Sequence, residues 1–423
     1  MTSLAPAQQH MHRTTLTNGL TVIAIENPVA DIVAARLFIR AGQCRETAEQ
    51  AGLFSLLMSV LTKGTQRRSS LEIAEAVESI GASLGADAAS DYSILSLKTV
   101  SSDFEAMLNL AAEILREPSF PTAELELERR LTLQGLRSMQ EQPFAVAFNQ
   151  LREAMYAEHP YALSSLGTAE SIQALSRDDL LAAHQTYFRP DNMIVTVVGR
   201  IVPQQAIALV EKALGDWQHP ASPLPALTLP ALTPKSQRRV TVQDTQQAII
   251  ILGYLAGSVK HPDYAALKLL STYLGNGLSS RLFVELREKQ GLAYDVSAFY
   301  PTRLSTSQFV AYIGTAPGNS AIALTGLCSE LDRLRTGVLT PAELQVAKNK
   351  LLGQYALGKQ TNGQIAQLLG WYEAIGLGTD FDQRFPADIS AVTLETIEAA
   401  VQHCFVEPYL SILGPADIVE SLY

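Results

Sequence analysis

Residues 33–42 read VAARLFIRAG, an apolar run that ends in Ala-Gly, and residues 248–257 read AIIILGYLAG, which ends in the same pair. The two Ala-Gly pairs lie 215 residues apart. Val198-Gly199 and Leu413-Gly414, each closing another apolar run, repeat the offset of 215, and the Ala-Glu-Leu of residues 123–125 recurs 219 residues later. Near-constant offsets at three points predict a duplicated domain.

A proline-rich segment separates the two copies. Five prolines lie between residues 220 and 234, in a stretch made otherwise of Ala, Leu, Thr and Ser. Prolines at this spacing exclude a helix or a central strand and favour an extended, semi-rigid connector. We therefore predict an N-terminal domain over residues 1–219, a linker over residues 220–238 and a C-terminal domain over residues 239–423.

The order of the elements predicts the α+β class. Strand patterns cover residues 21–26, 32–40, 92–99 and 193–198. Apolar residues at helical spacing lie between them; a candidate capping box of Thr47 and Gln50 precedes one such run. Strand pairs followed by helix pairs, repeated twice, predict two homologous duplicated domains, each a mostly antiparallel β-sheet covered by helices on one side.

Composition and charge exclude several classes of protein. The chain of 423 residues is 47% hydrophobic and 17% charged, which suits large globular domains. Its net charge of −10 disfavours a phosphate backbone, so no nucleic acid partner is expected. The N-terminus lacks a secretory signal pattern, and no apolar run approaches the roughly 18 residues of a membrane span. These features predict a cytoplasmic protein without a membrane span.

Residues 40–65, RAGQCRETAEQAGLFSLLMSVLTKGT, resemble the segment that carries the zinc motif of the pitrilysin/insulinase peptidases, the inverzincins. In that family a helix ending in Lys-Gly-Thr holds H-x-x-E-H, and a further Glu follows downstream. The resemblance covers almost the whole chain, and the chain's size and duplication fit the small-subunit branch that includes the mitochondrial processing peptidase. Other stretches that agree are HPYALSSLGTAESI (159–172), FRPDNMIVTVVG (188–199) and GNGLSSRLFVELREKQGLAY (275–294).

The zinc motif itself is degenerate in this chain. Counted back from the Lys-Gly-Thr of residues 63–65, the motif positions hold Ser55, Met58 and Ser59, and the downstream Glu position falls on Gly135, beside Gln134. The i, i+3, i+4 spacing puts the first three on one helix face. Two hydroxyls, a thioether and a glycine cannot replace two imidazoles and two carboxylates. We expect no metal and no other cofactor in this chain.

The other histidines offer no replacement for the motif. Glu158-His159 is half of an H-x-x-E-H motif, but Met155 stands where the first His would be. No G-x-S-x-G sequence indicates a serine nucleophile on a strand-to-helix turn.

The second half of the chain keeps a different pair of residues. Residues 279–299, SSRLFVELREKQGLAYDVSAF, predict an amphipathic helix that ends at Gly291 and a strand that begins near Tyr294. A helix–turn–strand of this length folds back, so Arg287 and Tyr294 are expected to point into the same space. Their spacing of seven resembles that of the Arg/Tyr pair with which pitrilysin-like enzymes hold the substrate backbone and stabilise the oxyanion.

The resemblance implies a zinc-less subunit of a heterodimeric zinc metallopeptidase, inactive alone. A homologous partner subunit would carry H-x-x-E-H and its zinc, and the pair would hydrolyse unfolded peptides in a closed chamber. Arg287 and Tyr294 would be this chain's catalytic contribution. A catalytically inactive scaffold, like the core proteins of respiratory complexes, is the alternative function, and homodimers of the isolated chain stay open as well.

Overall fold

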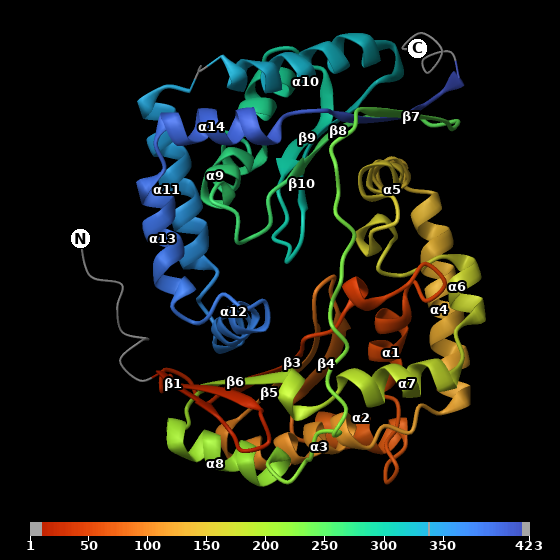
Figure 1. The fold of residues 1–423 in the computed structure, drawn as a ribbon, viewed down its shortest axis with the longest axis vertical. Coiled ribbons are helices and arrows are strands. Elements are labelled where there is room, and N and C mark those ends of the chain that lie inside the picture. The colour runs from red at the N-terminus through yellow and green to blue at the C-terminus, as the bar shows by residue number, and fades with distance from the viewer. Residues whose placement is uncertain (1–10, 337–338, 417–423) are drawn as a thin grey trace. The chain divides into compact units, whose positions relative to one another are not determined.

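The computed structural model describes residues 11–336 and 339–416, which form two compact units (Figure 1). Unit 1 contains residues 11–134, 164–228 and 356–382, and unit 2 contains residues 135–163, 229–336, 339–355 and 383–416. Each unit therefore includes a segment from the other half of the chain. The linear limits predicted from the repeat, at residues 219 and 239, stay a prediction.

Unit 1 is built on a six-stranded sheet in the order β1-β2-β6-β3-β5-β4. Neighbouring strands are antiparallel except β2 and β6, which are parallel. The central strands carry runs of Val, Ile, Leu and Phe because both of their faces are covered. The strands are β1 Met11–Thr15, β2 Thr21–Glu26, β3 Val33–Ile39, β4 Ser83–Ala88, β5 Ser93–Thr99 and β6 Met193–Gly199.

Unit 2 repeats this topology. Its five-stranded sheet has the order β7-β11-β8-β10-β9, which is strand for strand the order β2-β6-β3-β5-β4 of unit 1. The parallel pair recurs at the same place, between β7 and β11. Two mixed sheets with one topology are the structural counterpart of the sequence repeat, and the α+β prediction is confirmed. The strands are β7 Gln237–Val242, β8 Ala248–Ala256, β9 Ala293–Phe299, β10 Ser307–Thr315 and β11 Tyr409–Gly414.

Helices cover both faces of the unit 1 sheet. α3 and α8 pack on one face, whereas α12, from the second half of the chain, lies on the other face across β3 and β6 (Figure 1). Strand alternation explains the two covers: Phe38 points towards α12, and its neighbour Leu37 points the other way. The helices are α1 Leu53–Leu61, α2 Ser70–Glu78, α3 Phe104–Arg116, α6 Ala169–Ala174, α7 Arg177–Tyr187, α8 Pro203–Leu214 and α12 Asn362–Ala374, with short 3₁₀ turns η1 Gln43–Arg45, η2 Ser101–Asp103 and η4 Pro190–Asn192.

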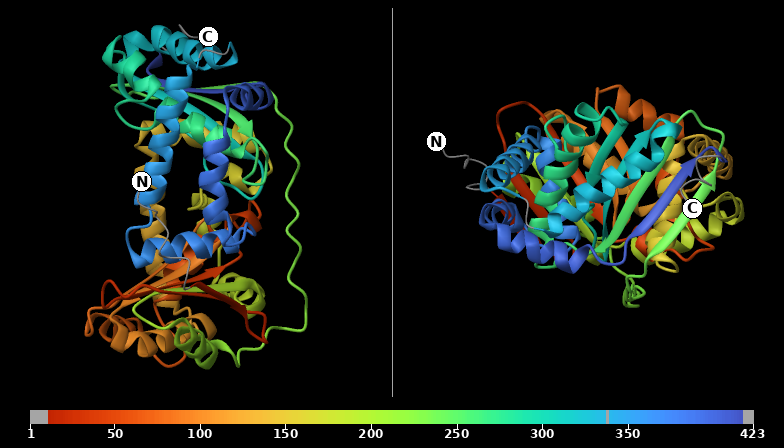
Figure 2. Two further views of the ribbon diagram at one scale, coloured as in Figure 1. Left: turned by 90° about the vertical axis from the view of Figure 1, so that its left-hand side faces the viewer. Right: turned by 90° about the horizontal axis from the view of Figure 1, so that it is seen from above.

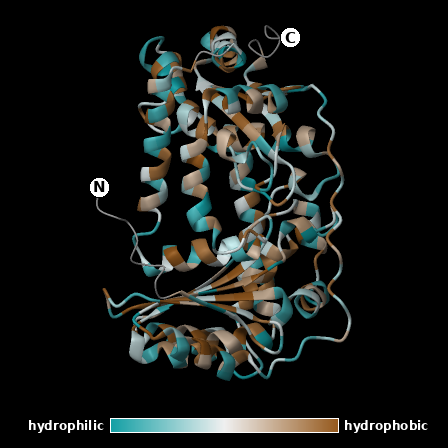
Figure 3. Cartoon of the chain, turned by 60° about the vertical axis from the view of Figure 1, so that its left-hand side comes forward, coloured by the Kyte–Doolittle hydropathy of each residue, from teal (hydrophilic) through white to brown (hydrophobic). Residues whose placement is uncertain are grey.

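The sheet of unit 2 receives a helix from the first half of the chain in the same way. α5 packs on β8 and β11, close to Gly253, where a side chain would meet Leu151 and Met155. The strands of the unit 1 sheet are largely brown, and the helices carry both brown and teal residues (Figure 3), as expected for amphipathic helices on an apolar sheet. The helices of unit 2 are α5 Pro143–Tyr156, α9 Tyr264–Gly275, α10 Ser320–Arg335 and α14 Leu394–Cys404, with 3₁₀ turns η3 Pro160–Ala162 and η6 Pro317–Asn319 and a π-helix, η5 Phe283–Glu288.

Three further helices each contain a boundary between the units: α4 Thr122–Gln140, α11 Pro341–Leu357 and α13 Phe381–Ala391. The Pro-rich segment contains neither helix nor strand up to β7 and runs as an extended green trace (Figure 2). Among the described residues no helix combines the length and the apolar character that a membrane span requires. The first ten residues, which carry the prediction of no secretory signal, lie outside the described part of the chain.

Candidate functional site

Helix α1 carries the three positions at which the resemblance places a zinc motif. Met58 is buried in the core, at 1% exposure, while Ser55 and Ser59 are half-buried. The Ser59 hydroxyl donates a hydrogen bond to the Leu56 carbonyl at 2.9 Å, so it is engaged within its own helix. Proteins bind Zn²⁺ through imidazole, thiolate and carboxylate groups. The α1 face offers none of these and does not fit the ion.

The downstream position does not supply a ligand either. Gly135 lies on α4, and no atom stands within 4 Å of the point that a Cβ would occupy there. Within residues 11–336 and 339–416, no group of three or more His, Cys, Asp and Glu side chains is arranged to hold a metal ion. We therefore assign no catalytic step through zinc to the described residues of this chain.

The start of α1 depends on a residue that the sequence interpretation missed. The predicted capping box of Thr47 and Gln50 is wrong, because the Gln50 N–H donates to the Thr47 carbonyl in a turn and the helix begins after Gly52, at φ 86°. The Glu46 carboxylate caps the helix instead: it accepts the Gly52 N–H at 2.9 Å and the Phe54 N–H at 2.8 Å.

Glu46 makes these contacts from a buried position. Loss of water contact raises its pKa to about 8, although both N–H groups favour the charged form. A capping box joins the N-cap residue to the residue three positions later. Glu46 reaches the helix from beyond the preceding turn, at the end of η1, so spacing alone does not reveal it.

The two buried histidines have structural roles. His159, in the half motif noted above, is 1% exposed, and its Nδ1 accepts the Tyr161 N–H at 3.1 Å. His184 Nε2 lies 2.8 Å from the Leu115 carbonyl oxygen, to which it donates. Burial lowers the pKa of each ring to about 4, so both are neutral at pH 7. Met155, on the helix before His159, is itself a core residue.

Arg287 and Tyr294 lie side by side in unit 2. The predicted helix is the π-helix η5; the chain reverses at Gly291, at φ 64°, and β9 begins at Ala293. Arg287 Nη1 donates to the Tyr294 carbonyl oxygen at 2.7 Å, and the Arg287 guanidinium lies 5.1 Å from the centre of the Phe283 ring. These two contacts fix the direction of the arginine relative to the start of β9.

The Tyr294 side chain faces solvent and is 59% exposed. It lines a shallow cavity of about 380 Å³ in unit 2, together with Pro143 and residues 245–247. The amides of Gln246 and Gln247 at this cavity can accept or donate hydrogen bonds to a peptide backbone. The geometry brings Arg287 and Tyr294 together, and Tyr294 also lines the cavity; the catalytic role of the pair stays a prediction.

Comparisons with known proteins indicate the same family as the sequence resemblance. Residues 21–169 match the family model "Insulinase (Peptidase family M16)", and residues 174–351 match "Peptidase M16 inactive domain". An uncharacterized zinc protease of Mycobacterium leprae is 28% identical over 417 residues, covering 95% of this chain and 91% of the relative. Another from Bacillus subtilis is 26% identical over 417 residues, covering 97% and 99%.

Solved structures agree with these matches. A peptidase M16 inactive domain from Pseudomonas fluorescens superimposes with a TM-score of 0.89 at 25% identity, covering 96% of this chain and 98% of that one. A protease from Helicobacter pylori shares the fold, with a TM-score of 0.90 at 22% identity and coverage of 96% and 99%. The chain belongs to the insulinase-type M16 peptidase family, with an M16 domain in its first half followed by an M16 inactive domain.

Proposed function

We propose that this chain is the zinc-less subunit of a two-chain M16 metallopeptidase that hydrolyses unfolded peptides. A homologous subunit would supply H-x-x-E-H and the zinc ion. The observation that carries the proposal is an asymmetry between the two halves. The motif positions on α1 hold Ser55, Met58 and Ser59, whereas Arg287 and Tyr294 are adjacent and exposed, and Tyr294 lines a cavity.

The two side chains suit this role chemically. An exposed phenol can donate one short hydrogen bond to the oxyanion that develops on the attacked carbonyl. The Arg287 guanidinium uses Nη1 on the Tyr294 carbonyl and has further N–H donors for a substrate carbonyl. The contacts with the Phe283 ring and the Tyr294 carbonyl hold the guanidinium in place, so less entropy is lost when it engages a peptide.

The proposal is tested by reconstitution with a same-sized relative that carries an intact H-x-x-E-H. Hydrolysis of an unfolded peptide by the mixture should fall about 10²–10³-fold with Tyr294→Phe, since one oxyanion donor is lost. Tyr312→Phe is the matched control: it removes a phenol on the neighbouring strand that donates to Asp295, and it should leave the rate unchanged. Full activity of a mixture carrying both Arg287→Ala and Tyr294→Phe would defeat the proposal.

A scaffold subunit without catalysis is the second candidate, and the family description "inactive domain" over residues 174–351 favours it. The two functions give different results in the same reconstitution. A scaffold forms a tight complex that lacks peptidase activity whichever residues stand at positions 287 and 294. The catalytic proposal requires activity that depends on both, and zinc that analysis finds in the partner subunit.

A further inference from the structure

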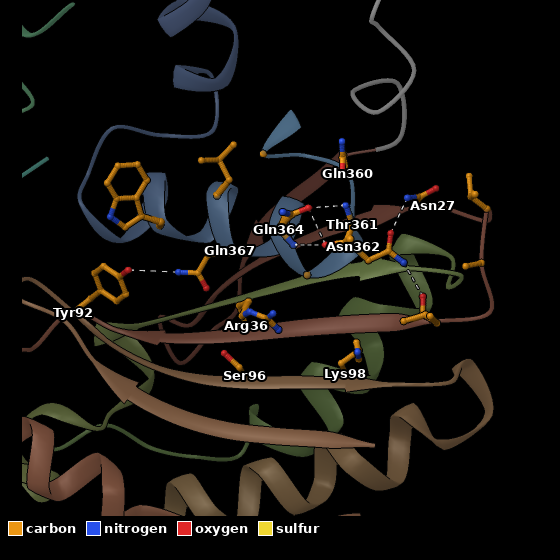
Figure 4. Close-up of a pocket in the computed structure, with 17 residues that line it drawn as sticks. Asn27, Arg36, Tyr92, Ser96, Lys98, Gln360, Thr361, Asn362, Gln364 and Gln367 are labelled. Carbon is orange, nitrogen blue, oxygen red and sulfur yellow. Dashed lines mark hydrogen bonds between the residues drawn. The ribbon is translucent and has the colours of Figure 1, made fainter. Parts of the chain in front are cut away.

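Unit 1 contains a second, larger cavity that the Arg287/Tyr294 chemistry does not use. It measures about 850 Å³ and lies between the sheet and the start of α12 (Figure 4). Its floor carries Arg36 from β3 and Ser96 and Lys98 from β5. Its opposite wall is the segment from Gln360 to Gln367 (Figure 4). Trp371, on α12, also lines the cavity.

The strand register explains why the floor is polar. Arg36 pairs with Ser96 and Ala34 with Lys98 across antiparallel strands, so Arg36, Ser96 and Lys98 project from one face of the sheet. The same face farther along holds Phe38 and Ile94, which belong to the apolar cluster under the end of α12. The sheet face therefore changes from apolar to cationic where the cavity opens.

The positive charge of the cavity is not balanced by an acidic lining residue. Two of the lining side chains are cationic and none is acidic. Arg36 Nη1 donates to the Ala35 and Leu97 carbonyl oxygens, at 2.9 and 3.2 Å, and burial lowers its pKa. Neither Arg36 nor Lys98 forms an ion pair within the described ranges 11–336 and 339–416. In a chain of net charge −10, this is a local concentration of positive charge.

The start of α12 adds to the positive potential. The capping box of Thr361 and Gln364 uses two backbone N–H groups, and the dipole of the helix makes this end positive. A Cβ on Gly363 would stand 2.8 Å from Arg36 Nη2, so the guanidinium lies close against this first turn. A cation beside the positive end of a helix is unfavourable unless an anion lies close to both.

The remaining lining indicates that the anion is part of a larger molecule. Val29, 90% exposed, and Ile32, 37% exposed, stand at the rim as unburied apolar side chains. Leu368 and Trp371 add apolar surface on the α12 side. The α12 side also carries the amide of Gln360, which can pair with peptide N–H and C=O groups. A free inorganic anion would use neither the apolar rim nor this volume.

We propose that the cavity of unit 1 binds an acidic peptide segment, with Arg36 and Lys98 holding its carboxylates and the apolar rim contacting the flanking side chains. The inference rests on the proposed function in one respect, that peptides reach this face. It extends that function by naming acidic segments as the sequences that the chain retains.

Binding can be measured on the isolated full-length chain through Trp371. The chain has two tryptophans, so Trp217→Phe leaves Trp371 as the only one, inside the cavity. The probes are acetyl-Leu-Glu-Ala-Glu-Leu-amide and the same peptide with Gln in place of Glu. We expect the acidic peptide to change the Trp371 emission and to bind about tenfold more tightly, with an affinity that falls as salt rises.

Variants of the floor separate local from overall charge. Lys98→Gln, at an exposed position, should lower the affinity for the acidic peptide about three- to tenfold and leave the affinity for the Gln peptide unchanged. Lys212→Gln is the matched control, because it removes the same charge from an exposed surface pair with Glu105 on α3. Arg36→Lys, which keeps the charge but loses the planar fork, should also weaken binding.

Three results would overturn the inference. The chain could bind the two peptides with equal affinity, or Lys98→Gln and Lys212→Gln could lower the affinity for the acidic peptide equally. Inorganic phosphate could also bind the cavity, as followed by Trp371 emission, as tightly as the acidic peptide does. Because the titration needs no zinc-bearing partner, it is independent of the reconstituted reaction. An inactive mixture with intact peptide binding refutes the peptidase proposal alone, and an active mixture with no peptide preference refutes this one alone.

Discussion

The buried carboxyl of Glu46 determines how the degenerate motif helix begins. It accepts two N–H groups at the start of α1, where the helix dipole favours a negative charge. Its pKa is nevertheless raised to about 8, because burial removes the water that stabilises a carboxylate. The folded chain therefore keeps the proton on Glu46 over a range of pH in which the unfolded chain has already released it.

This linkage predicts a pH-dependent stability. Between pH 4.5 and about 8 the unfolded state ionises Glu46 while the folded state keeps the proton, so the free energy of unfolding falls as pH rises. Glu46→Gln removes that dependence. Relative to the parent chain, the free energy of unfolding of the variant in urea should rise by about 4 kcal/mol between pH 5 and pH 9.

Glu75→Gln is the control for Glu46→Gln, since Glu75 is exposed on α2 and the substitution changes the net charge equally. The control should show no comparable trend with pH. A difference between Glu46→Gln and the parent that stays constant from pH 5 to pH 9 would show that the folded state ionises Glu46 normally.

At the scale of an element, α12 packs against the unit 1 sheet through Gly370. A Cβ at this position would overlap the Phe38 ring and the Thr196 hydroxyl. Gly370→Ala should therefore destabilise the protein by about 1–3 kcal/mol in chemical denaturation, because the helix must move away from the sheet. Trp371 and Ala374 would lose part of their contact with the apolar cluster at the same time.

Gly353 provides the matched helical control. It lies within α11, and no atom stands within 4 Å of the point that a Cβ would occupy. Gly353→Ala should be neutral or stabilise by up to about 1 kcal/mol, since alanine restricts the unfolded chain and favours a helix. Equal effects of the two substitutions would mean that α12 does not rest on the sheet as closely as described.

The elements differ in how far the sequence predicts them. Residues 21–26 and 193–198 form strands as expected, because β-branched and apolar runs bounded by turn residues determine strands locally. The cap of α1 was missed because Glu46 lies outside the local window. The π-helical form of η5 was missed because a π-helix is rare and occurs mostly as a single turn within an α-helix, which a helical pattern of apolar residues does not distinguish. The docking of α12 on the first sheet depends on contacts far apart in sequence, which periodicity does not encode.

The candidate site was predictable in the same uneven way. Arg287 and Tyr294 are separated by one turn, so their proximity follows from local chain reversal at Gly291. The cavity over Arg36 and Lys98 could not be predicted, since its second wall comes from residues more than 250 positions away. The signal of it in the sequence was a single cation on each of two largely apolar strands, Arg36 on β3 and Lys98 on β5.

For the whole molecule, the duplication is completed by an exchange of helices. α5 comes from the first half and packs on β8 and β11 of unit 2, while α12 comes from the second half and packs on β3 and β6 of unit 1. Each sheet therefore has one face covered by the other half of the chain. Neither half buries its own sheet completely, although each carries a full set of strands for it.

This exchange predicts how the chain responds to division at its connector. A fragment of residues 1–228 lacks α12 and leaves Ile23, Phe38 and Ile194 uncovered, at a cost of about 1.5–3 kcal/mol for each such side chain. Fragments 1–228 and 229–423 should each aggregate or unfold without cooperativity when expressed alone, and should form a one-to-one complex when expressed together. Size-exclusion chromatography and thermal unfolding of the three samples measure this, and a monodisperse fragment 1–228 with a cooperative transition of its own would contradict it. A full-length chain nicked between residues 228 and 229 after folding serves as the control, because the exchanged helices are already in place and should keep the two pieces associated.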